Sequence, residues 1–243
     1  MGEFEINNLE AEILRIEPSF IIYMYGGYGT GVFDEYSDMD LVIYCDSLPD
    51  EVIRESIRGV GSLILCENEK LDVIVYGGKK VDLRYMDESE LSLIVEEKSL
   101  DFLNYVIYTR PVSRINSVIS ECQDSFDPRP FIYSSEQIEQ KLGVLEMDLE
   151  KLKVAYIRED DFYLQYLKNY MVERILKVVY SLNEVPYVYP KKSSKMLVGM
   201  DLPINVSEIR DDLLYLVKKP DDNEFFYSKI SKLEKIIGGL RKK

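Results

Sequence analysis

Residues 26–44 read GGYGTGVFDEYSDMDLVIY, and this stretch carries the most informative pattern in the chain. The hydrophobic run before it, residues 20–25, is predicted to form a strand that ends at the glycines. A second apolar run begins at Met39, and Asp38 and Asp40 lie on either side of this first residue. Side chains two residues apart on a strand point to the same face, with Cα atoms roughly 6.5–7 Å apart. We therefore expect the two carboxylates to lie together.

The glycines of residues 26–31 come close to two phosphate-binding loops without completing either. A dinucleotide fingerprint that starts at Gly27 needs a glycine at position 32, and a P-loop that starts at Gly26 needs a lysine there, but the residue is Val32. What remains is a turn whose backbone N–H groups can approach phosphate closely. Gly26, Gly27 and Thr30 are candidate nucleotide-binding residues; the alternative is a plain strand-ending turn.

A third carboxylate lies further along the chain. Asp82 alternates with apolar residues in KKVDLRY, residues 79–85, and Asp72 on the preceding predicted strand is its competitor. If Asp38, Asp40 and Asp82 converge, two charges at ~4 Å repel by about 4 kcal/mol at an effective dielectric near 20. Such a cluster predicts a divalent cation, and an all-oxygen ligand set favours Mg²⁺. The alternative is that Asp38 and Asp40 are exposed aspartates at a strand edge.

Composition narrows the chemistry further. The 243-residue chain has no histidine and three cysteines without a C-x-x-C pair, which argues against structural zinc and against Ser-His or Cys-His catalysis. Its net charge of −14 makes nucleic acid an unlikely partner and favours a cationic small molecule. No apolar stretch is long enough to span a membrane and the N-terminus is acidic, so we expect a cytoplasmic protein without a membrane partner, as a monomer or homodimer.

Residues 127–130, Asp-Pro-Arg-Pro, mark the expected domain boundary, since two prolines in three residues block a helix. We expect an α+β fold, with a mixed-sheet catalytic domain in residues 1–127 and an all-α, substrate-binding helical bundle in residues 128–243. The first domain should contain a β-hairpin turning at Gly77-Gly78. The expected helices span residues 48–58, with Ser47 as N-cap, and about residues 138–156, 164–182, 207–218 and 223–240. Ser134 and Gln137 are placed to form a capping box before the second of these helices. Apolar residues spaced three and four apart predict that the second and third helices are amphipathic.

The chain resembles the DNA polymerase β-like nucleotidyltransferase superfamily. The resemblance covers about residues 20–86: a strand ending in Gly26-Gly27, the pair Asp38-Met39-Asp40 entering the next strand, and Asp82 on a later one. Family members usually have Gly-Ser at the glycine position, so the serine hydroxyl is missing here. The resemblance implies that Asp38, Asp40 and Asp82 are catalytic metal ligands for Mg²⁺ and that ATP or another NTP is the donor.

In layout the chain is most similar to the small-molecule nucleotidyltransferases related to aminoglycoside and lincosamide resistance enzymes. That similarity implies that Ser37 contacts the nucleotide and that basic residues of the helical domain, Lys192 and Lys195 with Lys191, contact phosphate. The alternative for the lysines is a solvated loop. The expected activity is transfer of a nucleoside monophosphate, AMP from ATP, to a hydroxyl of a small molecule. The alternatives are transfer to a protein or an RNA end, and a non-catalytic, antitoxin-like nucleotide-binding protein.

Overall fold

The computed structural model describes residues 3–188 and 223–242 of the chain. It divides into two compact units, Met1–Phe126 and Asp127–Lys243. The expected α+β fold class is confirmed: a mixed sheet with helices is followed by a helical unit. The predicted helix at residues 207–218 and Lys191, Lys192 and Lys195 lie outside the described residues. Within the described part, no helix is both long and apolar enough to cross a membrane.

The first unit is built on a six-stranded sheet in the order β3-β4-β5-β2-β1-β6. β2 and β5 are parallel, whereas every other recorded neighbouring pair of the sheet is antiparallel. The strands are β1 (Ile21–Met24), β2 (Met39–Cys45), β3 (Ser62–Asn68), β4 (Leu71–Tyr76), β5 (Lys79–Asp87) and β6 (Arg110–Pro111). The helical segments are α1 (Glu3–Ile16), α2 (Gly26–Thr30), α3 (Glu51–Arg58), α4 (Glu88–Glu97), α5 (Leu100–Phe102), the π-helical turn η1 (Leu103–Ile107) and α6 (Ser117–Asp124).

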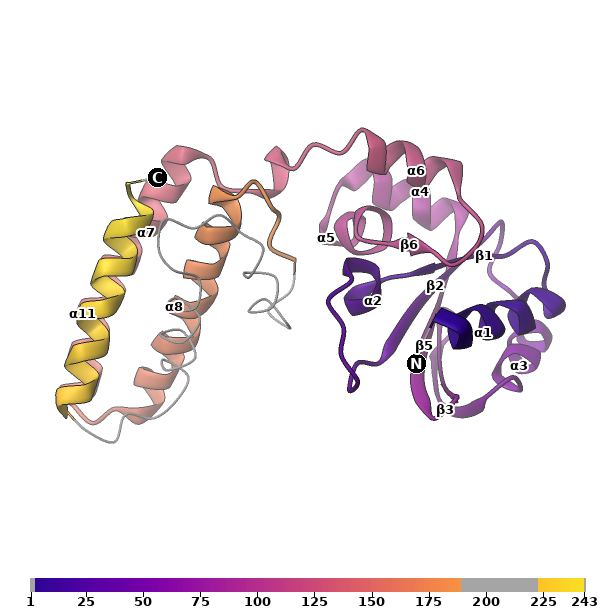
Figure 1. Cartoon of the computed structure of the whole chain (residues 1–243), viewed down its shortest axis with the longest axis horizontal. Coiled ribbons are helices and arrows are strands. Elements are labelled where there is room, and N and C mark those ends of the chain that lie inside the picture. Colours follow the sequence, from indigo (N-terminus) through magenta and orange to yellow (C-terminus); the bar gives the residue numbers. More distant parts are fainter. Residues whose placement is uncertain (1–2, 189–222, 243) are drawn as a thin grey trace. The chain divides into compact units, whose positions relative to one another are not determined.

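Helices cover the two faces of this sheet, with α1 and α3 on one side and α4, α5 and α6 on the other (Figure 1). Residues 41, 43, 83 and 85 pack with α1 and α3 in one apolar core. Because side chains alternate along a strand, Asp40, Val42 and Asp82 point to the opposite face. The candidate site therefore lies on the side of the sheet that carries α4, α5 and α6.

Local sequence explains most of these elements, with two corrections. The β4–β5 hairpin turns at Gly77 and Gly78, whose φ angles of +57° and +77° are those of a two-residue hairpin turn of type I′. Helix α3 begins at Glu51 rather than at residue 48, and its N-cap is Asp50, whose carboxylate accepts the Ile53 N–H, rather than Ser47. Strand β3 was not predicted, because its register shifts against β4 break the alternation that marks a strand.

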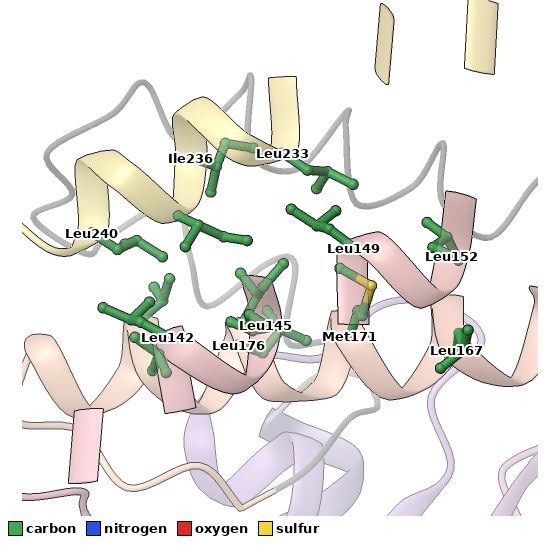
Figure 2. Close-up of a cluster of buried hydrophobic side chains, with 14 of the residues drawn as sticks. Leu142, Leu145, Leu149, Leu152, Leu167, Met171, Leu176, Leu233, Ile236 and Leu240 are labelled. Carbon is green, nitrogen blue, oxygen red and sulfur yellow. The ribbon is translucent and has the colours of Figure 1, made fainter. Parts of the chain in front are cut away.

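The second unit contains two long antiparallel helices, α7 (Ser135–Ile157) and α8 (Asp161–Leu182), and a third, α11 (Asn223–Leu240). The 3₁₀ turn η2 (Arg129–Phe131) precedes them. The predicted capping box is present, since Ser134 and Gln137 exchange side-chain and backbone hydrogen bonds. Leu and Ile side chains of the three helices point toward one another and form a single apolar core (Figure 2). The predicted amphipathic periodicity of α7 and α8 is confirmed.

Candidate active site

Asp40 and Asp82 lie directly opposite each other on the parallel strands β2 and β5. Neighbouring strands are about 4.8 Å apart, so the two Cα atoms are near neighbours and both side chains point to the same face. Asp38, one residue before β2, points to that face by the same alternation. Asp38, Asp40 and Asp82 are called the acidic cluster below. Both side chains of the Asp40–Asp82 pair are partly exposed.

The competing residue Asp72 lies on the other face of the sheet. Its Cα partner is Leu83, whose side chain belongs to the core against α1 and α3. Asp72 is fully buried and paired with Arg54, with Nη2 2.6 Å from Oδ1 and Nε 3.1 Å from Oδ2. Burial alone would raise the pKa of Asp72, but the hydrogen bonds and charge of Arg54 outweigh it and hold the pKa below its usual value. Asp72 is thus a structural carboxylate.

Lys80 is a basic residue that the structure places in contact with the acidic cluster. Its Nζ lies 3.0 Å from Oδ1 and 3.2 Å from Oδ2 of Asp82, and 3.6 Å from Oδ2 of Asp38. The hydrogen bond to Asp82 raises the pKa of Lys80, so the ammonium stays charged. Lys80 therefore neutralises part of the repulsion between the carboxylates. The strand alternation of KKVDLRY contained the signal, since residues 80, 82 and 84 share one face.

The glycine turn packs directly against the acidic cluster. The turn continues from β1 as the short helix α2, and the Tyr25 N–H donates to the Asp40 carbonyl oxygen at 2.9 Å. Gly26 has φ +58°, and a Cβ at this position would lie 2.4 Å from Oδ2 of Asp40. Glycine is thus required here for both conformation and space. Its absence of a side chain leaves a backbone N–H surface beside a carboxylate, where a phosphate and its metal ion could meet.

The two hydroxyl residues predicted for nucleotide binding make local hydrogen bonds. Thr30 Oγ1 donates to the carbonyl oxygens of Gly26 at 3.0 Å and Gly27 at 3.2 Å. Ser37 is buried; its hydroxyl accepts the Asp34 N–H at 2.8 Å and donates to Asp34 Oδ1 at 2.9 Å. Both hydroxyls shape the chain between β1 and β2, and their contact with nucleotide stays a prediction.

An aromatic and cationic group that the sequence did not single out borders the acidic cluster. The Tyr25 and Tyr105 rings are 5.0 Å apart, and the Arg84 guanidinium lies 4.8 Å from the Tyr105 ring centre. Arg84 is paired with Glu90 at 2.6 Å. Burial, followed by the charges of Tyr105, Asp40 and Asp82, raises the pKa of Tyr25, so its hydroxyl stays protonated at neutral pH. Tyr25 directly precedes the glycines, which is the one local hint of its place.

The residues fit a magnesium site, although they are not gathered around one point. In the described part of the chain, no group of three acidic, cysteine or histidine side chains is close enough to hold a metal ion as arranged. Lys80 instead stands between Asp38 and Asp82. Oδ1 of Asp82 is buried and, among the described residues, receives no hydrogen bond of acceptable geometry despite the nearby ammonium. An under-satisfied carboxylate oxygen in an all-oxygen donor set suits a hard cation such as Mg²⁺.

Comparison with known families agrees with this geometry. A family model described as a nucleotidyltransferase domain matches residues 6–178. The chain belongs to this family. The match spans the whole sheet of the nucleotidyltransferase unit and continues into α8, and it confirms the resemblance inferred from the glycine turn and the aspartates. No curated protein matches the chain.

Three solved structures resemble the nucleotidyltransferase chain at low identity. A nucleotidyltransferase-like protein from Exiguobacterium sibiricum 255-15 is 10% identical at a TM-score of 0.37, covering 98% of this chain and 72% of that one. The Thermotoga maritima CCA-adding enzyme complexed with tRNA is 11% identical at a TM-score of 0.37, and the match covers 94% of this chain and 66% of that one. A cytoplasmic RNA terminal U-transferase is 17% identical at a TM-score of 0.27, and the match covers 42% of this chain and 33% of that one. The expectation that nucleic acid is an unlikely partner of this chain rests on its net charge of −14 alone.

Proposed function

We propose that this nucleotidyltransferase transfers a nucleoside monophosphate, AMP from ATP, to a hydroxyl of a small molecule and releases pyrophosphate. The observation that carries the proposal is the pairing of Asp40 with Asp82 on parallel strands, with Gly26 held against Asp40. The family supports nucleotidyl transfer, and the acidic cluster supports a metal-dependent form of it. The similarity in layout to small-molecule nucleotidyltransferases supports a small-molecule acceptor, and the net charge of −14 favours a cationic one.

In this proposal the acceptor hydroxyl oxygen bonds to the α-phosphorus while the bond from that phosphorus to the bridging oxygen breaks. Asp38, Asp40 and Asp82 would hold Mg²⁺, and Asp82 or a carboxylate beside it would accept the hydroxyl proton. Magnesium, when bound, supplies charge stabilisation on the phosphates and a lower pKa of the attacking hydroxyl. The backbone N–H groups at Gly26 and Gly27 would orient the β- and γ-phosphates.

The second part of the chain, residues 127–243, would bind the acceptor in this proposal. The three helices of its core are packed by apolar side chains, and Lys192 and Lys195 remain candidate phosphate contacts. The alternative acceptors are a protein hydroxyl and an RNA end. Charge argues against RNA, because a chain with 44 acidic against 30 basic residues repels a phosphate backbone.

Pyrophosphate release and the fate of the label test the proposal together. The chain is incubated with Mg²⁺ and each of four α-labelled NTPs, with a small-molecule extract, with the protein fraction or with RNA as acceptor. We expect pyrophosphate release that depends on the small-molecule fraction and is highest with ATP. Label recovered on protein or RNA would replace the small-molecule acceptor. No pyrophosphate with any NTP and any fraction would overturn catalysis.

Asp40→Asn is the site variant for this assay, and Asp46→Asn is its matched control. Asp46 is an exposed carboxylate just beyond the other end of β2, so the same chemical change is made away from the acidic cluster. We expect Asp40→Asn to lose pyrophosphate release and Asp46→Asn to keep it. Full turnover in Asp40→Asn would contradict the proposed site.

A further inference from the structure

Lys80 holds the position at the acidic cluster that a metal ion would compete for. Its ammonium group contacts both oxygens of Asp82, at 3.0 and 3.2 Å, and lies 3.6 Å from Oδ2 of Asp38. Mg²⁺ would need these same oxygens at about 2.0–2.1 Å. A metal ion there would repel the like-charged ammonium group, so it would weaken the contacts of Lys80 with Asp38 and Asp82.

The Lys80 side chain is also accessible to solvent. It is 41% exposed and sits on the second residue of β5, directly after the Gly77-Gly78 turn. Its neighbour Lys79 points to the other face and donates to the Glu35 carbonyl oxygen at 2.6 Å, which ties the hairpin to the chain that leads into β2. Lys79 thus fixes the hairpin in place, while Lys80 retains a flexible four-carbon stem at the edge of the site.

We propose that Lys80 is an exchangeable counter-ion, which neutralises Asp38 and Asp82 in the metal-free protein and turns to the nucleotide phosphates when a divalent cation takes those carboxylates. This inference rests on the proposed function. Neighbouring carboxylates without a counter-charge cost free energy. The exchange avoids this cost, because a cation compensates the acidic cluster both with and without the metal ion. It also brings a cation to a triphosphate that enters an otherwise acidic protein.

Metal binding without nucleotide tests the first half of the exchange. Mn²⁺ is titrated into the full chain and free Mn²⁺ is followed by electron paramagnetic resonance. Lys80→Gln removes the competing ammonium, so we expect Mn²⁺ to bind about tenfold more tightly than to the wild type. Lys79→Gln is the matched control, since it removes the same charge from the adjacent residue on the other face; its affinity should stay within about twofold of wild type.

The outcomes separate this inference from the proposed function. Mn²⁺ that binds the wild type and Lys80→Gln equally, or binds Lys80→Gln more weakly, overturns the exchange and leaves the proposed metal site standing. Binding to neither protein overturns both. An equal gain in Lys79→Gln and Lys80→Gln would show a general charge effect and would also overturn the exchange. Thermal unfolding with and without Mn²⁺ checks that each variant is folded.

Steady-state kinetics test the second half. If Lys80 contacts the phosphates, Lys80→Gln should raise KM for the nucleotide about tenfold. Lys80→Arg should recover most of this loss, because it restores a positive charge that can donate to phosphate. An unchanged KM in Lys80→Gln, or no recovery in Lys80→Arg, would overturn the phosphate contact.

Discussion

Gly26 and Asp40 approach each other so closely that a Cβ at position 26 would be 2.4 Å from the carboxylate oxygen Oδ2. The contact joins the strand-ending glycine turn to the first strand aspartate, two features that lie 14 residues apart in the sequence. Gly26 also adopts φ +58°, a conformation that other residues rarely adopt. The turn and the carboxylate are consequently a single packing unit.

Gly26→Ala should impair catalysis more than it impairs folding. The methyl group must displace Asp40 or the turn, so we expect kcat to fall by at least about tenfold, as small misplacements at reacting groups cost that much or more. Gly78→Ala is the control, because its φ is +77° but no atom lies within 4 Å of the added Cβ. Each variant should lose about 1–2 kcal/mol of folding free energy from the backbone strain alone. Equal activity in the two variants would contradict the role of the contact.

Asp82→Asn should abolish turnover while leaving the fold intact. Loss of a metal ligand or general base lowers kcat by about 10²–10⁴-fold. The Asp82 side chain is partly exposed, and its pair with Lys80 is worth no more than about 1 kcal/mol. Pyrophosphate release and urea unfolding measure the two effects. Retention of more than a tenth of the wild-type rate would remove Asp82 from the site.

Asp72→Asn should show the opposite behaviour. Removing Asp72 from a buried ion pair leaves Arg54 with the largely exposed Glu51, 4.0 Å away, as its counter-charge, so we expect a loss of about 3–5 kcal/mol in the free energy of unfolding at pH 7. Activity per folded molecule, measured at a temperature where both proteins are folded, should stay near wild type. A variant that is stable and inactive would place Asp72, rather than Asp82, in the active site.

The stability difference between wild type and Asp72→Asn should depend on pH. Burial would raise the pKa of Asp72 in the folded protein. The hydrogen bonds and charge of Arg54 outweigh this effect, so the pKa is lowered. A carboxyl group with a lowered folded pKa stabilises the protein above its unfolded pKa, near 4, and loses this contribution as pH falls through the folded pKa. Urea unfolding at a series of pH values should therefore show the gap shrinking below about pH 4. A gap that is constant with pH would assign the loss to packing instead of charge.

Removal of divalent cations should stop the reaction reversibly. The acidic cluster cannot hold the triphosphate by itself, because like charges repel, so excess EDTA should reduce pyrophosphate release by at least about 100-fold. Added Mg²⁺ in excess of the chelator should restore it. Circular dichroism should not change on chelation, since Lys80 compensates the carboxylates in the metal-free state. Undiminished turnover in EDTA would exclude a metal-dependent mechanism.

Several elements were predictable because their signals are local. The Ser134–Gln137 capping box opens α7 at the predicted residue, and the periodic leucines of α7 and α8 form the helical core. The Gly77-Gly78 turn joins the two strands as expected. Strand β3 was not predicted, since bulges disturb its alternation. The start of α3 was misplaced, since Asp50 is a better-placed N-cap than Ser47.

Strand alternation and turn chemistry act over a few residues, so the amino-acid sequence alone indicates that Asp38 and Asp40 share one face of a strand that follows a glycine turn. That Asp82, and not Asp72, meets them is seen only in the folded protein. That choice depends on the parallel pairing of β2 with β5 and on the burial of Arg54 against Asp72, both contacts between segments far apart in the chain. The place of Lys80 between Asp38 and Asp82 was decided in the same way. Local periodicity fixes the face on which a side chain lies, whereas strand pairing fixes which charges meet there.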